Sequence, residues 1–266
     1  RAVFDHMFQN EGLTPPASYP YTRHYELNGA FMQTFIRTPA DTNTDLFQWT
    51  VNPRYYDRPD TILFETNDAD TTGAATITVN WVGRSIATHY EWAAVRRGDG
   101  LVTSVADSVS WFSLVEKSAT ATLFGSALSP GRTNAMRLWG KGHSGAPDGT
   151  SNEIDLVGFD WFDLTYWRRY LALNGVLEFS GPATGGEYQV HAGRFLADST
   201  RLYDVTDPEH PVRLVLDEAH VVRSSQLSFD FQDSAATGQR RAYVAAAIAY
   251  DSPTYGPRTP PATSFT

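Results

Sequence analysis

The chain has 266 residues, a formal net charge of −9 at pH 7 and no cysteine. Its 41% hydrophobic and 13% aromatic residues are typical of a globular protein, which at this length buries a large core without cross-links. The acidic balance argues against a nucleic-acid-binding protein. The absence of cysteine excludes disulfides, thiolate zinc sites and a cysteine nucleophile within these residues. No apolar run reaches the roughly 18 residues that a membrane-spanning helix needs.

Residues 1–23 are predicted to be a lead-in segment, because Pro15, Pro16 and Pro20 interrupt any regular pattern. From residue 24 onward, short runs of alternating apolar and polar residues are separated by Gly, Asn, Asp and Pro. This is the pattern of antiparallel strands with one buried face. The run AATITVNWV at 74–82 is the clearest. The strands predicted in this series are 24–27, 31–37, 46–50, 61–66, 74–82, 89–95, 101–105, 108–115, 119–124, 134–139 and 155–166.

Many short strands with little helical periodicity predict an all-β protein. Residues 24–170 are expected to form a jelly-roll β-sandwich of the galactose-binding-like type, and residues 171–251 a second, smaller β-sandwich. The alanine-rich run at 241–248 is interpreted as a strand from its neighbours, although alanine favours helix. Residues 252–266, rich in Pro, Ser and Thr, are expected to be a linker toward a further domain. The strands predicted in the second series are 176–179, 187–195, 201–205, 212–216, 226–231 and 241–248.

The segment LYDVTDPEHPVRL at 202–214 predicts a hairpin or corner. Apolar and polar residues alternate from Tyr203 to Thr206, and the run 206–208 then breaks the pattern, because Pro208 has no N–H and favours a turn. Asp204 and Asp207 have no base, nucleophile or metal ligand beside them in the sequence, so we expect them to cap N–H groups of the turn. Replacing either with alanine is expected to lower folding stability and to leave any binding intact.

Two acidic loops are candidate sites for a structural calcium ion. The string DADTTG at 68–73 places Asp68 and Asp70 at alternate positions before a glycine, the spacing that opens a calcium loop, but the usual bidentate glutamate is missing at the end of the loop. The second loop contains Asp148 and Asp155. The alternative is that both loops are ordinary polar turns, because Asp, Thr and Gly are common turn residues. No other cofactor is expected.

Exposed aromatic side chains would offer a stacking platform for a sugar or a peptide. Tyr55 and Tyr56, in the polar segment NPRYYDRPD, are the candidates for such a platform. Most of the remaining aromatic residues lie in alternating runs, where packing in the core is expected. The tryptophans are Trp49, Trp81, Trp92, Trp111, Trp139, Trp161 and Trp167.

The sequence contains no recognisable catalytic constellation. The histidines are not spaced as a metal-binding pair, and the GHSG string at 142–145 lacks the strand–turn–helix setting of a nucleophile elbow. No phosphate-binding loop or dinucleotide fingerprint occurs. We therefore expect these residues to carry no catalytic site and no enzyme activity.

An ordered series of short motifs runs through residues 128–212. The motif L-x-x-G-x-N is fitted with one extra residue by Leu128, Gly131 and Asn134. It is followed by D-x-(I/F)-x-(I/L)-x-Y-x-R, N-G-x-L-x-F, a widely spaced Y-x-V-x-x-F, and Y-D-V-T-x-P-x-x-P-V. The residues that fit these are Asp160, Phe162, Leu164, Tyr166, Arg168, Asn174, Gly175, Leu177, Phe179, Tyr188, Val190, Phe195 and the run 203–212. The series resembles the non-catalytic β region that precedes the peptidase domain in gingipain-type cysteine peptidases, including the related sortase of type IX secretion.

The resemblance implies a bacterial protein that is extracytoplasmic, either secreted or at the cell surface, in which a caspase-like catalytic domain follows residue 266. The catalytic His–Cys pair of the family matches no residue here, so this chain would position that domain or dock a substrate or secretion partner. The sequence begins with Arg1 and not with methionine, which also predicts that these residues are a piece of a longer protein. Two alternatives stay open, a carbohydrate-binding module of an extracellular enzyme and a calcium-stabilised structural domain. None of the three involves nucleic acid or membrane insertion.

Overall fold

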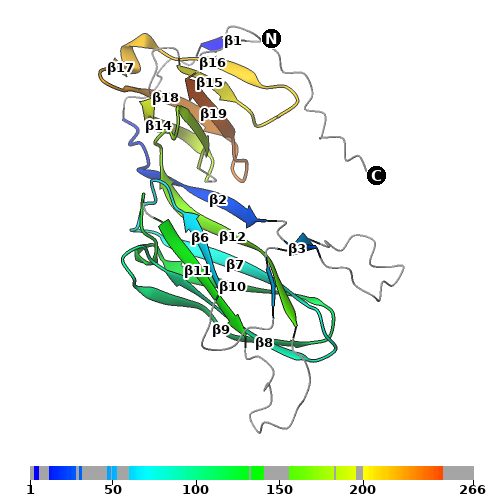
Figure 1. The fold of residues 1–266 in the computed structure, drawn as a ribbon. Helices are drawn as coiled ribbons and strands as arrows, with labels where there is room; N and C mark the ends of the chain where they lie inside the picture. The colour runs from blue at the N-terminus through cyan, green and yellow to red at the C-terminus, as the bar shows by residue number, and fades with distance from the viewer. Residues whose placement is uncertain are drawn as a thin grey trace, which may run out of the picture. The chain divides into compact units, whose positions relative to one another are not determined.

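The computed structural model describes residues 3–5, 12–27, 30–31, 47–48, 50–52, 60–131, 133–140, 156–182, 184–195 and 200–247. The chain divides into a larger unit, Ser18–Arg169, and a smaller unit, Tyr170–Thr266 with Arg1–Ala17 (Figure 1). Apart from 3-10 turns at Gly125–Ala127 and Glu218–His220, the regular structure of the described residues is strand, which confirms the predicted all-β class. These residues include no helix long and apolar enough to cross a bilayer.

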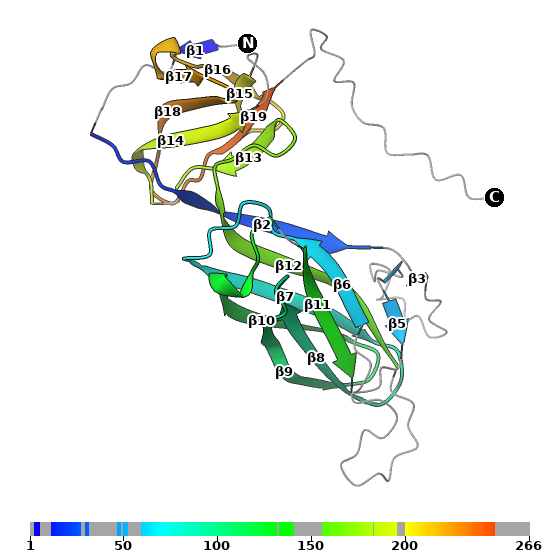
Figure 2. The same cartoon turned by 60° about the vertical axis from the view of Figure 1, so that its left-hand side comes forward.

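Eight strands in the described part of the larger unit form two sheets. They are β2 (Ser18–Glu26), β6 (Asp60–Glu65), β7 (Ala74–Gly83), β8 (Thr88–Arg96), β9 (Val102–Phe112), β10 (Glu116–Phe124), β11 (Thr133–Gly140) and β12 (Val157–Arg169). One sheet has the order β10-β7-β12-β2 and the other β6-β11-β8-β9 (Figure 2). Strand β2 pairs with β12, β6 with β11, β7 with β10 and β8 with β9, all antiparallel. The pairs are nested, because the first of the eight strands in chain order pairs with the last and the two middle strands pair with each other. This nested pairing is the topology of a jelly roll.

Three short strands accompany the jelly roll. They are β3 (Ala30–Phe31), β4 (Phe47–Gln48) and β5 (Thr50–Asn52). Strands β3 and β4 pair with each other, and β5 pairs with the beginning of β12. The strands predicted at 31–37 and 46–50 lie largely outside the described residues.

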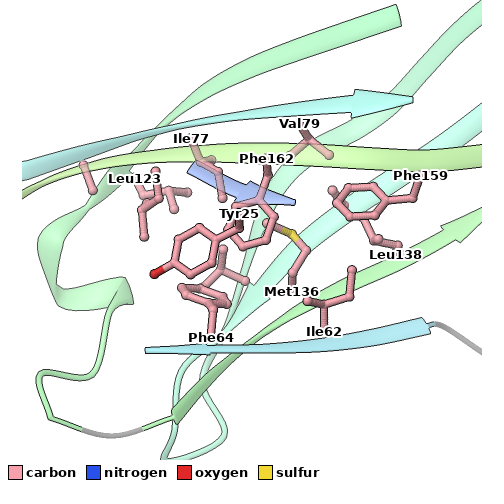
Figure 3. Close-up of a cluster of buried hydrophobic side chains, with 14 of the residues drawn as sticks. Tyr25, Ile62, Phe64, Ile77, Val79, Leu123, Met136, Leu138, Phe159 and Phe162 are labelled. Carbon is pink, nitrogen blue, oxygen red and sulfur yellow. The ribbon is translucent and has the colours of Figure 1, made fainter. Parts of the chain in front are cut away.

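Strand β12 lies between β7 and β2, and its alternation decides which of its side chains enter the core. Phe162, Leu164 and Tyr166 are buried, and the residues between them point to the outer side of the sheet. Phe162 stacks on Tyr25 of β2 with ring centroids 4.5 Å apart, and its centroid lies 5.3 Å from that of Phe64 (Figure 3). Because Phe64 belongs to β6 of the opposite sheet, these rings join the two sheets through the core.

Two sequence predictions in the larger unit are corrected. Strand β2 begins at Ser18, inside the segment predicted to be a lead-in, and it contains Pro20. In the described residues β2 is an edge strand, where a residue without an N–H does not interrupt a ladder. The runs predicted separately at 101–105 and 108–115 correspond to one strand, β9. Irregularities in its pairing with β8 shift the alternation of side chains, so the sequence pattern breaks where the strand continues.

The smaller unit contains a five-stranded and a three-stranded sheet in its described residues. Its strands are β1 (Val3–Asp5), β13 (Val176–Ser180), β14 (Gly186–Phe195), β15 (Thr200–Asp204), β16 (Val212–Val215), β17 (Val221–Arg223), β18 (Leu227–Ala235) and β19 (Ala242–Ala247). The orders are β1-β16-β15-β19-β13 and β14-β18-β17. The ring of Phe231 on β18 lies 5.9 Å from that of Phe179 on β13 and 5.1 Å from that of Tyr243 on β19, so aromatic contacts join the sheets.

The predicted hairpin at 202–214 is confirmed, because β15 and β16 pair antiparallel with Leu202 opposite Leu214. The alanine-rich run forms strand β19 between β15 and β13, as its neighbours predicted. Ala245 of this strand is completely buried. Tertiary packing therefore overrides the helix preference of alanine here.

Candidate functional site

Several of the ligand residues proposed from the sequence lie outside the described residues. These are Tyr55, Tyr56, Asp148 and Asp155. Asp68 and Asp70 lie within them, in the loop that joins β6 to β7. Within the described residues, no three or more His, Cys, Asp or Glu side chains are grouped to hold a metal ion.

The carboxylate of Asp70 is bonded within its own loop and to β2. Its Oδ1 accepts hydrogen bonds from the N–H and the hydroxyl of Thr72, at 3.0 and 2.7 Å, and its Oδ2 accepts one from the Ser18 hydroxyl at 2.8 Å. These bonds, those from Thr72 foremost, hold the pKa of Asp70 below its ordinary value, although partial burial acts in the opposite direction. The N–H of Asp70 also donates to the carbonyl of Trp167 at 2.7 Å. This arrangement is that of a polar turn attached to the end of β12.

Asn134, from the first motif of the sequence series, bonds a buried turn of the larger unit. Its side chain is almost fully buried. Oδ1 accepts from the N–H of Ser129 at 2.9 Å, and Nδ2 donates to Oγ1 of Thr66 at 3.0 Å. The Thr66 hydroxyl in turn donates to the carbonyl of Ser129 at 3.2 Å, which closes a ring of hydrogen bonds. The motif residue therefore satisfies buried polar groups and has a structural role.

The Y-D-V-T motif forms a polar corner in the smaller unit. Oδ1 of Asp204 accepts from the N–H of Thr206 at 2.9 Å, and its Oδ2 accepts from Nη1 of Arg241 at 2.8 Å. The hydroxyl oxygen of Thr206 accepts from the N–H of Ala242 at 3.0 Å. The corner therefore ties the β15–β16 hairpin to the beginning of β19.

A tyrosine pair lies beside this corner. The hydroxyl of Tyr243 donates to Oδ2 of Asp233 at 2.6 Å and is hydrogen-bonded to the hydroxyl of Tyr188. Burial raises the pKa of Tyr188 to about 12 and also raises that of Tyr243. Both phenols therefore stay protonated at neutral pH, so neither supplies a phenolate nucleophile or base.

Asp207 caps the hairpin turn, as predicted. Its Oδ1 accepts from the N–H of Glu209 at 3.0 Å, and its Oδ2 lies 2.9 Å from Nδ1 of His210. The hydrogen bond with His210, followed by that from Glu209, lowers the pKa of the Asp207 carboxyl. Asp204 and Asp207 thus both cap N–H groups of the hairpin corner.

The outer side of the β10-β7-β12-β2 sheet carries residues that the sequence analysis did not select. The strand register aligns Thr22, Thr165, Thr76 and Thr122 in one row across the sheet, and His24, Asp163, Thr78 and Thr120 in the next. Trp161, opposite Glu26, lies beyond one row, and Trp167 and Phe124 lie beyond the other. We call this surface the threonine face and define it by the residues Thr22, His24, Glu26, Thr76, Thr78, Thr120, Thr122, Phe124, Trp161, Asp163, Thr165 and Trp167.

Hydroxyl pairs link neighbouring strands on the threonine face. Oγ1 of Thr22 lies 2.8 Å from Oγ1 of Thr165, and Oγ1 of Thr78 lies 2.9 Å from Oγ1 of Thr120. In each pair one hydroxyl donates and the other accepts, and the accepting hydroxyl keeps its own proton for a further bond. The face therefore presents ordered donors and acceptors on a rigid sheet.

His24 lies between two carboxylates on this face. Its Nδ1 is 2.7 Å from Oδ1 of Asp163, its Nε2 is 3.1 Å from Oε2 of Glu26, and its ring centroid is 5.5 Å from that of Trp161. Partial burial acts to lower the pKa of His24, but the hydrogen bonds to Asp163 and Glu26 outweigh it and raise the pKa above its ordinary value. The side chains beside Trp161 are thus held in fixed positions.

Among the described tryptophans, Trp81 and Trp111 are buried in the core as expected, whereas Trp92, Trp139, Trp161 and Trp167 are only partly buried or exposed. Trp161 is only half-buried, and the exposed fraction of Trp167 is 39%. In the run FDWFDLTYW at 159–167 both phases of the alternation carry aromatic rings, so the rings alone do not identify the buried side. The polar residues identify the outward side, because Asp163 and Thr165 alternate in phase with the two tryptophans, and the buried side is then the other one.

No protein-family model matches the chain. No curated protein matches it either. Among solved structures, dimeric latent PorU from Porphyromonas gingivalis has a similar fold, with a TM-score of 0.56 at 9% sequence identity over 89% of this chain. This chain spans 21% of the length of that one. Structures of infectious bursal disease virus strains Gx and Gt align with 87% and 90% of this chain and 40% and 42% of theirs, at 11% and 9% identity, but their TM-scores of 0.34 and 0.35 carry no argument.

Proposed function

We propose that this chain is the non-catalytic β region of a secreted or surface-exposed bacterial cysteine peptidase of the gingipain type. In this proposal a caspase-like domain of the same polypeptide carries the catalytic His–Cys pair, and the two β units position it or dock its substrate or secretion partner. The chain itself has no peptidase activity.

The observation that carries the proposal is the likeness of most of the chain to PorU, a gingipain-like protein, at a TM-score of 0.56. The ordered motif series supports it independently. Asn134 and the Y-D-V-T corner make the hydrogen bonds of turns and corners that hold the fold together. A fold-determining role of this kind explains why such residues would recur in order among proteins that share the architecture.

The carbohydrate-binding and calcium alternatives, as drawn from Tyr55, Tyr56, Asp148 and Asp155, remain predictions, because these residues lie outside the described part of the chain.

The first test is the coding sequence beyond residue 266. The proposal requires it to encode a caspase-like α/β domain that contains a histidine and a cysteine in the positions of the catalytic pair. A reading frame that encodes no such domain would contradict the proposal.

The second test separates the activity of this chain from that of the proposed full-length peptidase. The purified 266-residue chain is incubated with fluorogenic peptides that carry basic, acidic or apolar residues before the scissile bond. The full-length peptidase and its variant with the catalytic cysteine changed to alanine are assayed beside it. We expect cleavage by the unsubstituted full-length peptidase alone. Hydrolysis by the 266-residue chain that a single substitution abolishes would overturn the assignment.

A further inference from the structure

We propose that the threonine face of the larger unit binds an extended, uncharged glycan chain. This inference does not depend on the peptidase assignment, because it rests on side chains of the jelly roll alone. It also differs from the sequence-based sugar site at Tyr55 and Tyr56, which lies outside the described residues.

Aromatic rings lie at both ends of the threonine face. Trp161 and Trp167 lie on the same outward phase of β12, six residues apart and therefore about 20 Å from each other along the strand. Phe124, at the end of β10, is 82% exposed on the same side as Trp167. Exposed aromatic side chains that gather on one sheet face among polar residues are typical of an interaction surface. Two separated aromatic positions suit a chain of pyranose rings, whose C–H faces stack on aromatic rings.

Polar side chains cover the surface between the rings. Two rows of threonine hydroxyls, with His24 and Asp163, fill the space from Trp161 to Trp167. Hydroxyl, carboxylate and imidazole groups exchange hydrogen bonds in both directions with sugar hydroxyls. The pairs Thr22–Thr165 and Thr78–Thr120, at 2.8 and 2.9 Å, hold these groups in place before a ligand arrives.

The charge of the threonine face favours this ligand over its competitors. The residues that define the threonine face include two carboxylates and no lysine or arginine. A nucleic acid or an acidic polysaccharide would bring its anionic groups toward Asp163 and Glu26, whose two charges His24 can offset only in part. The hydroxyl rows equally disfavour an apolar protein surface, because they would lose water without finding partners. An uncharged polyhydroxyl chain satisfies all of these groups.

Gly73 supports the position of Trp167. A Cβ atom at residue 73 would lie 2.4 Å from Cδ1 of Trp167, so the indole ring occupies the space that any larger residue would need. The ring therefore lies over Gly73, immediately before β7. This places a partly exposed ring in a fixed position, as a stacking platform requires.

The experiment is affinity electrophoresis of the whole chain through gels that contain barley β-glucan, xyloglucan, galactomannan or arabinoxylan, with heparin as the anionic probe. We expect at least one neutral polysaccharide to retard the protein and heparin to leave its mobility unchanged. Trp161→Ala and Trp167→Ala should each weaken the retarding interaction roughly tenfold. Phe112→Ala removes an exposed ring from β9 of the other sheet and should leave it unchanged.

Folding is controlled in the same samples. Each variant is used only where its circular dichroism spectrum and melting temperature match those of the unsubstituted 266-residue chain, called the parent chain. Should a tryptophan variant misfold, the double variant Thr78→Val and Thr120→Val keeps the shape of the face and removes two hydroxyls, and it should also bind less tightly. Retardation by none of the neutral polysaccharides, preference for heparin, or full binding by the folded variants would overturn the proposal.

Discussion

Asp204 and Arg241, which are 37 residues apart in sequence, are joined by a hydrogen bond of 2.8 Å from Nη1 of the arginine to Oδ2 of the aspartate. The Asp204 side chain is only 12% exposed, and its other oxygen accepts the N–H of Thr206. The same arginine lies 3.4 Å from the carboxylate of Asp233. One carboxylate thus fixes the turn of the hairpin and its attachment to the neighbouring strand.

Replacing Asp204 should destabilise the smaller unit. Asp204→Ala leaves Arg241 without this bond and the Thr206 N–H without its acceptor, and we expect a loss of about 2 kcal/mol in the free energy of unfolding. Asp204→Asn keeps a carbonyl for Thr206 and removes the charge, so its loss should be smaller. Far-UV circular dichroism during urea unfolding measures both changes.

Two controls accompany the Asp204 variants. Asp207→Ala removes a cap from the same turn, but that side chain is 62% exposed, so its effect should be the weakest of the three. All seven tryptophans lie within Ser18–Arg169, so tryptophan fluorescence follows the larger unit and should keep its transition midpoint. Equal losses for Asp204→Ala and Asp207→Ala would show that the bond to Arg241 contributes nothing.

Asn134 gives the corresponding prediction for the larger unit. Asn134→Ala removes the acceptor of the Ser129 N–H and the Nδ2 donor to Oγ1 of Thr66 in a buried place, and we expect a loss of about 3 kcal/mol. Thr133→Ala, at the exposed neighbouring position, should change the free energy of unfolding by less than about 0.5 kcal/mol. Tryptophan fluorescence during urea unfolding measures both variants. A variant at 134 as stable as the one at 133 would show that water or a rearranged turn replaces the asparagine.

Asp204 and Asn134 show how much of this structure the sequence predicts. Alternation located most strands, because each has one side against a core, and the proline and aspartates of 202–214 identified a hairpin. The contact of Asn134 with Thr66 spans 68 residues, so no local pattern contains it. The buried side of β12 was not assigned, because aromatic rings occupy both phases of FDWFDLTYW. Pro20 suggested an end to regular structure, whereas the edge position of β2 accepts it.

The pH dependence of stability should contain a contribution from His24. The folded-state pKa of His24 is raised above its ordinary value, so its contribution is fully present below the unfolded pKa of about 6.5 and is lost as pH rises through the folded pKa. Because the side chain is 49% exposed, solvent screens the pair, and the effect should stay below about 1 kcal/mol.

The variant His24→Gln tests this contribution. Urea unfolding followed by tryptophan fluorescence from about pH 6 to pH 8 should show the parent chain more stable than the variant at the acidic end, with the difference shrinking as pH rises. His210→Gln removes a histidine that also pairs with an aspartate, but in the smaller unit, and should leave this profile unchanged. Parallel profiles for the parent chain and His24→Gln would show that Asp163 and Glu26 do not favour the charged imidazole.

Asp70 distinguishes the two interpretations of the DADTTG loop. Its carboxylate accepts hydrogen bonds from Thr72 and Ser18, so we expect Asp70→Ala to lower the melting temperature of the larger unit equally in millimolar calcium and in chelator. A ligand that binds only the folded state stabilises it by RT ln(1 + [L]/Kd), so a calcium ion held by Asp70 would make the loss larger in calcium than in chelator. Melting curves of the parent chain and of Asp70→Ala in both solutions, followed by tryptophan fluorescence, measure the difference.

Stabilisation of the parent chain by calcium that persists in Asp70→Ala would place the ion elsewhere, with the acidic loop of Asp148 and Asp155 as the next position to substitute. Stabilisation that disappears in Asp70→Ala would contradict the polar-turn interpretation and establish the calcium loop.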